Sequence, residues 1–231
     1  MNYKTHFLSI LFLVSFHLNA QHKNNFEAGL YNIGFGGVVG GVGAIINKKP
    51  NEKTVKVFLK GLYQGALGGY LIFESKRLVG KFGKSGNYAF IWPSKIINSA
   101  GTSIMENAAS NISFWERWHI NLGFNRFELN TKNKFKISYR IMPFAFGSAI
   151  YGFIKGKIDI NKSLKMGTFV FFTNKISSEN PEGIAFANSI LLLNRKNRTL
   201  SKKHILSHEL LHTYQYESFS GLNAFLNKPI Q

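Results

Sequence analysis

The chain has no cysteine among its 231 residues, and only 11 acidic residues against 29 lysines and arginines. Without thiols there can be no disulfide and no nucleophilic cysteine, so the fold is stabilised by packing alone. The shortage of acidic side chains leaves a formal net charge of +18. A charge of this size often accompanies nucleic-acid binding. Here the basic residues are spread along the chain, so we expect no nucleic-acid partner.

Several motifs of enzymes and nucleotide-binding proteins are also missing. The sequence has no G-x-S-x-G and no P-loop, and its glycine-rich runs lack the strand-to-helix context of a dinucleotide site. No low-complexity stretch marks a linker. Apolar residues, in contrast, are abundant, at 45 % of the chain with 22 phenylalanines. This composition excludes global disorder and predicts a buried core.

Residues 1–20 have the pattern of a secretory signal peptide. Lys4 precedes an apolar run, and the small Ala20 is followed by Gln21. The run is about 12 residues long, short of the roughly 20 that a membrane-spanning helix needs. We therefore expect cleavage after Ala20 and export to the periplasm or cell envelope, including the outer membrane, or secretion. An uncleaved membrane anchor is the alternative.

Two glycine-rich runs, residues 28–46 and 55–73, contain glycines spaced four apart. On a helix this spacing places the glycines on one face, where two backbones can approach closely. Residues 21–80 are therefore expected to form a helical hairpin, with a glycine-rich β-hairpin as the competing interpretation. Residues 28–73 either contact a membrane or pack against the rest of the protein.

Residues 81–231 are expected to form an α+β domain. An amphipathic helix begins near Ser94, where apolar residues recur at helical spacing. Beyond it, the stretches "WHINLGFNRFEL" and "FKISYRIM" alternate apolar and polar residues, which predicts strands with one buried face.

The second half of this domain is expected to continue the sheet. Residues 149–160 and 164–173 are predicted to form another hairpin, and Ile184–Asn194 a further strand. The result is an antiparallel meander of about five strands. The expected fold is thus α+β: a glycine-rich helical hairpin and a helix, the meander, and a C-terminal strand followed by a helix.

The last helix carries the sequence His208-Glu209-Leu210-Leu211-His212. It is predicted to begin after Ser201, a residue type that caps helices. Histidines four apart on a helix lie on one face, so both can direct a ring nitrogen at one metal ion. Zinc accepts two imidazoles readily and lowers the pKa of a bound water toward about 7. Glu209 would then take the proton from that water.

The segment "HELLH" on a helix that follows a strand resembles the zincin metallopeptidases. "HELLHTYQ" is similar to the HExxHxxQ form of compact zinc-protease-like domains in secreted bacterial proteins. The resemblance covers only Gly183 to Phe219. It implies zinc ligands at His208 and His212, a general base at Glu209, and a peptide or protein substrate that pairs with the preceding strand.

The resemblance does not extend to the third zinc ligand that this family requires. Glu217 is the only acidic residue after the motif, and no Asp, Glu or His follows it. On a continuous helix it points about 140° away from the second histidine, so it can bind the metal only if the helix ends near Tyr216. His204 lies one turn too early to join the pair. Asp159 or His119 from the meander are the alternatives.

Three functions remain open from the sequence. The first is an exported, zinc-dependent, metallopeptidase-like protein that hydrolyses peptide bonds. The second is a non-enzymatic structural protein of the envelope or outer membrane. The third is a pseudoenzyme that binds metal without catalysis.

Overall fold

The computed structural model describes residues 25–132, 134–174, 182–194, 201–219 and 223. The expected signal peptide lies outside these residues. Among the described helices, only α2 (Asn25–Ile46) is long and apolar enough to cross a membrane, and half of its most apolar stretch is buried in the protein. An apolar helix near the N-terminus is compatible with a signal sequence or an anchor, and also with a core helix.

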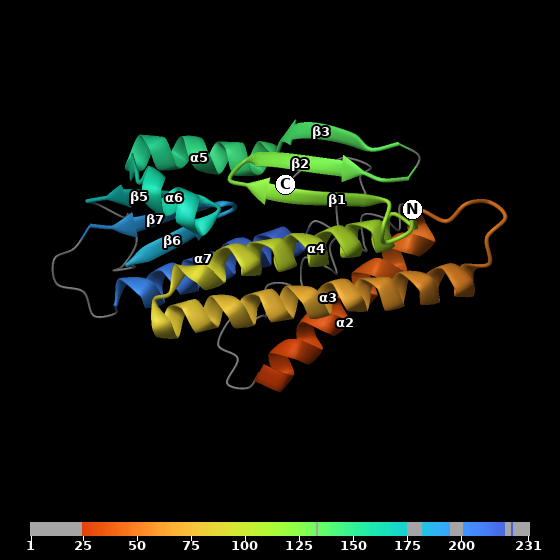
Figure 1. The fold of residues 1–231 in the computed structure, drawn as a ribbon. Coiled ribbons are helices and arrows are strands. Elements are labelled where there is room, and N and C mark those ends of the chain that lie inside the picture. The colour runs from red at the N-terminus through yellow and green to blue at the C-terminus, as the bar shows by residue number, and fades with distance from the viewer. Residues whose placement is uncertain (1–24, 133, 175–181, 195–200, 220–222, 224–231) are drawn as a thin grey trace, which may run out of the picture.

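The expected α+β architecture is confirmed. Long helices occupy one side of the molecule, and two small sheets with shorter helices occupy the other (Figure 1). The long helices are α2, α3 (Thr54–Ser85), α4 (Ile91–Ala109) and α7 (Lys202–Ser218), with a short 3-10 turn at Tyr88–Phe90 before α4. Helix α3 runs past residue 80, where the hairpin was expected to end.

The glycine-rich runs form the predicted helical hairpin of α2 and α3, and the β-hairpin interpretation is wrong. Gly36 and Gly40 on α2 face Gly61 and Gly65 on α3 so closely that an added Cβ would overlap backbone of the other helix. Helical glycine costs close to 1 kcal/mol relative to alanine, and close backbone packing offsets this cost.

Helix α4 lies between α3 and the first sheet (Figure 1). The helix predicted near Ser94 is confirmed. It does not have one buried and one exposed face as expected, because most of its residues on every side are buried. Its buried residues include the charged Lys95 and Glu106. Such charges require buried partners.

The first sheet is a three-stranded antiparallel meander, as predicted, of β1 (Arg117–Leu122), β2 (Asn125–Asn130) and β3 (Lys136–Ile141). Alternate residues do share a face, but the buried face is the polar one. His119 and Asn121 are buried against α4. The apolar residues that alternate with them, Trp118, Ile120 and Leu122, are only partly buried.

The expected second hairpin is present only as a short antiparallel pairing of Lys157 and Ile158 with Phe171 and Phe172, and helix α6 (Ile160–Met166) replaces its expected turn. Residues 149–160 belong mostly to helix α5 (Pro143–Lys155), followed by the two-residue strand β4 (Lys157–Ile158). Pro143 sits in the first turn of α5, a favoured position. The buried side of α5 consists of small residues, among them Gly152, where a Cβ would overlap the Phe171 ring. Because α5 buries its small residues and exposes its large ones, its large apolar residues do not recur at the spacing that identifies a helix in a sequence.

The second sheet is mixed rather than a continuation of the meander. Its strand order is β4-β5-β7-β6, and β5 and β7 are parallel. The expected single strand Ile184–Asn194 is a hairpin, turning at Ala187 with φ 47°. The remaining elements are α6 (Ile160–Met166), β5 (Phe169–Thr173), β6 (Gly183–Phe186) and β7 (Ser189–Leu193).

Candidate functional site

Helix α7 carries the HELLH sequence and packs against α3 and β6. Its apolar side, Leu206, Leu210 and Tyr214, is fully buried in the main hydrophobic core. Ser201 occupies the predicted N-cap position, but its hydroxyl contacts His204 Nδ1 at 3.0 Å instead of capping the backbone. Burial of one side of α7 leaves His208 exposed and His212 partly exposed.

The two histidines of the motif lie together, as predicted. Their Nε2 atoms are 3.1 Å apart, and the rings meet edge to face with centroids 4.6 Å apart. Partial desolvation of the ring, together with the neighbouring His212, lowers the pKa of His208 below its usual value. A neutral His208 is the form that can bind a metal ion.

Gln215 orients the second histidine of the pair. Its Oε1 lies 2.8 Å from Nδ1 of His212, and an amide oxygen can only accept. Nδ1 of His212 therefore carries the proton, and Nε2 presents a lone pair toward His208. A hydrogen bond that fixes the tautomer in this way is the usual support of a metal-binding histidine.

Glu209 points in another direction, toward the edge strand β6. Its side chain is buried, and burial raises the pKa of its carboxyl group. The backbone N–H of Ala185 donates a hydrogen bond to the carboxylate, which partly opposes this rise, as does His212. The Glu209 carboxylate thus lies between the face of α7 that carries the two histidines and the edge of the second sheet.

Gly183 allows β6 to lie this close to α7. A Cβ at this position would be 3.0 Å from Cγ of Glu209 and 3.0 Å from Cγ2 of Ile205. The strand that contains Ala185 was expected to border the site, but the contacts of Gly183 and Ala185 with Glu209 were not predicted. A glycine within a strand is a signal of close backbone approach, and Gly183 carries that signal.

Glu217, the predicted third ligand, lies on the opposite side of the helix from the two histidines. Its carboxylate accepts from Lys95 Nζ at 2.7 Å and from Asn98 Nδ2 at 2.5 Å, both on α4. Helix α7 continues to Ser218, so the condition for Glu217 to turn toward the metal, an earlier helix end, is not met.

The two alternative third ligands are also occupied elsewhere. His119 is buried in the first sheet, where its ring contacts Thr102 and Ser103 of α4. Asp159 caps α6 by accepting from the backbone N–H of Lys162. Within the described residues, no three His, Asp or Glu side chains are grouped so that they could hold a metal ion.

No protein family model, no curated protein and no solved structure matches the chain. The expected membership in the zincin superfamily is therefore wrong. It rested on about 35 residues around "HELLH", and the described part of the chain lacks the three-ligand group that a zincin site requires. What remains is a His208–His212 pair with Glu209 beside it on the same helix.

Proposed function

We propose that the protein is an exported zinc-dependent hydrolase of peptide bonds. In this proposal His208 and His212 bind one zinc ion, and Glu209 accepts a proton from the attacking water. The observation that carries it is the separation of the two Nε2 atoms. The proposal rests on this geometry and not on family membership.

The Nε2 separation is close to that of a zinc site. Two nitrogens bound at about 2.0 to 2.1 Å to one tetrahedral zinc ion lie about 3.3 Å apart. The observed 3.1 Å therefore requires an adjustment of only a few tenths of an ångström. Gln215 already holds His212 in the tautomer that binds metal through Nε2. Little reorganisation then opposes metal binding.

Glu209 has the properties of a general base. Burial raises the pKa of its carboxyl group, which makes the carboxylate a stronger proton acceptor than an exposed glutamate. A bound zinc ion would supply a water of lowered pKa. With two protein ligands, the remaining coordination positions are open to water and substrate. A protein that bound zinc at these histidines but hydrolysed no peptide would be the pseudoenzyme.

Export is the second part of the proposal. It is supported by the signal-peptide pattern of residues 1–20 and by the complete absence of cysteine, which makes the protein indifferent to an oxidising compartment. The mature chain would begin at Gln21, and its N-terminal sequence after purification from the periplasm or envelope tests this part.

The metal site is tested by elemental analysis and peptide hydrolysis on matched variants. Wild type is expected to bind one zinc per chain, and His212→Ala to bind none. Glu209→Gln retains both imidazoles, so zinc should stay while hydrolysis of a peptide library falls by about 10² to 10⁴. His204→Ala, one turn earlier on the exposed side, is the control and should leave both unchanged.

The outcomes separate the three functions. Zinc without turnover in wild type would select the pseudoenzyme. No bound zinc in wild type would refute the site and leave the structural role. Equal activity in Glu209→Gln and wild type would refute the assignment of the base.

A further inference from the structure

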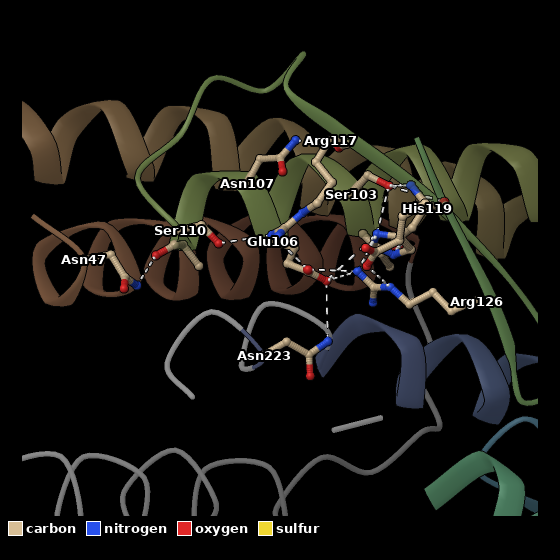
Figure 2. A network of polar contacts seen from close by, with 12 residues as sticks. Asn47, Ser103, Glu106, Asn107, Ser110, Arg117, His119, Arg126 and Asn223 are labelled. Carbon is tan, nitrogen blue, oxygen red and sulfur yellow. Dashed lines mark hydrogen bonds and ion pairs between the residues drawn. The ribbon is translucent and has the colours of Figure 1, made fainter. Parts of the chain in front are cut away.

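The three-stranded sheet turns its polar side inward. Arg126 on β2 is fully buried and donates to Glu106 of α4 at 2.8 Å and to Glu128 at 2.7 Å. His119 joins the same cluster, and Asn223 approaches Glu106 from the C-terminal segment at 3.4 Å (Figure 2). A buried ion cluster of this kind fixes which side of the sheet faces α4.

The apolar side chains of the sheet consequently face outward. They form one row across the strands, because Trp118 pairs with Leu129 and Leu129 pairs with Ile137. The edge strand β3 and the residue before it expose the most, with Phe135 at 83 % and Ile137 at 78 %. A contiguous row of exposed large apolar side chains marks a contact with a membrane or another protein.

Helix α5 extends this surface. Its small residues are buried, and its large ones point outward: Phe144, Phe146, Ile150, Tyr151, Phe153 and Ile154 are all exposed. The α5 surface joins the sheet through Phe146, whose ring meets Phe124 between β1 and β2 with centroids 5.1 Å apart. Figure 1 shows α5 and the sheet along one side of the molecule and α2 along the other.

The same segment is strongly basic. Residues 131–168 contain eight lysines and arginines (132, 134, 136, 140, 155, 157, 162 and 165) and one aspartate (159), a net charge of 8 − 1 = +7. Lys134, Lys136, Lys155 and Lys157 are all exposed. Lys155 at the end of α5 lies beside the exposed Tyr151, with its Nζ 5.9 Å from the ring centroid, and Lys157 follows in β4. Positive charge therefore borders the α5 part of the apolar surface, whereas Lys136 alternates with Ile137 and lies on the other face of β3.

We infer that the outer face of the β1–β2–β3 sheet together with α5 binds the surface of an anionic lipid bilayer. Exposed aliphatic and aromatic side chains beside lysines are the pattern of interfacial membrane attachment. Trp115, which is 61 % exposed, and Trp118 lie at one end of the face, and tryptophan favours the membrane interface. Protein interfaces, in contrast, are depleted in lysine. The inference is independent of the metal site.

Vesicle flotation of the full chain tests this surface. The probes are vesicles of phosphatidylcholine with phosphatidylglycerol and vesicles of phosphatidylcholine alone. Wild type is expected to float with the anionic vesicles. The doublet Ile137→Ser with Ile154→Ser should lower partitioning about tenfold or more. The control doublet, Val55→Ser with Tyr63→Ser, alters equally exposed residues on α3 and should keep partitioning within about twofold of wild type.

A charge-reversal pair tests the electrostatic part. Each lysine near an anionic surface strengthens binding about fivefold, so Lys155→Glu with Lys157→Glu, at the end of α5, should lower partitioning by more than tenfold. Lys53→Glu with Lys56→Glu removes the same charge from the α2–α3 loop and the start of α3, and should have a smaller effect. All variants alter exposed residues, and their circular dichroism should match wild type.

Three results would overturn the inference. The first is failure of wild type to bind anionic vesicles. The second is equal loss of binding in the α3 control doublet, which would transfer the contact to the glycine hairpin. The third is a wild-type dimer in light scattering that the Ile137/Ile154 doublet dissociates while vesicle binding is unchanged, which would identify a second copy of the chain as the occupant.

Discussion

Replacing Gly65 by alanine should separate the two helices of the hairpin. Gly65 lies where α2 and α3 are packed backbone to backbone, and an added Cβ would overlap the carbonyl oxygen of Gly36 and lie 3.0 Å from Cα of Gly40. Both obstacles are backbone atoms, which cannot rotate away as a side chain can. The methyl group is therefore accommodated only by moving one helix.

The expected size of the effect combines two opposing terms. Overpacking a close contact costs about 1–3 kcal/mol, and the backbone obstacles place Gly65→Ala at the upper end. In the opposite direction, alanine stabilises a helix by close to 1 kcal/mol relative to glycine. The net loss is about 2 kcal/mol, or roughly 4–8 °C in Tm for a chain of this size. Thermal unfolding followed by circular dichroism measures it.

Gly80 provides the matched control within the same helix. In the described part of the chain, outside the backbone of its own helix, no heavy atom lies within 4 Å of an added Cβ at this position. Gly80→Ala should therefore gain only the helix propensity, up to about 1 kcal/mol, and raise Tm. If Gly65→Ala is as stable as Gly80→Ala, the close packing of the hairpin is refuted.

Three further predictions concern polar residues. Gln215→Leu should lower zinc affinity about 10- to 100-fold in calorimetric titration, because His212 loses the acceptor that fixes its tautomer; unchanged affinity would contradict that role. Glu217→Gln leaves Lys95 buried without its counter-charge and should cost about 3–5 kcal/mol in urea unfolding with zinc binding intact; loss of zinc at unchanged stability would instead make Glu217 a ligand. Burial and the nearby Arg126 lower the pKa of His119 well below its usual value. Below about pH 6.5 this histidine is therefore protonated in the unfolded chain but stays neutral in the folded protein, which favours unfolding. Stability should fall by roughly 1 kcal/mol from about pH 7 to 5.5, and a constant urea midpoint over this range would contradict it.

The candidate site was only partly predictable from the sequence. The four-residue spacing of His208 and His212 on a helix is a local property, and their proximity follows from helix geometry alone. The partners of Glu209 and Glu217 are not local. They depend on which elements pack against α7: Gly183 and Ala185 of β6 on one side, and α4 on the other.

The error at α5 has a related cause. A sequence pattern locates the buried side of an element by its large apolar residues. In α5 those residues face outward, and only alanine, serine and glycine are buried. The helical period of the small residues is present in the sequence, but small residues carry little weight in an apolar pattern.

The sequence alone favoured the helical hairpin over a β-hairpin, because glycines repeated every four residues fall on one face of a helix, where two backbones can approach closely. It also determined that alternate residues of the meander share a face, because side chains alternate along any strand. It did not determine which face is buried. That choice was made by Glu106 on α4, whose buried carboxylate binds Arg126 and so draws the polar side of the sheet inward and leaves the apolar side exposed. An ion pair between residues 20 positions apart on different elements exists only in the folded protein, and here it outweighed the apolar pattern of the strands.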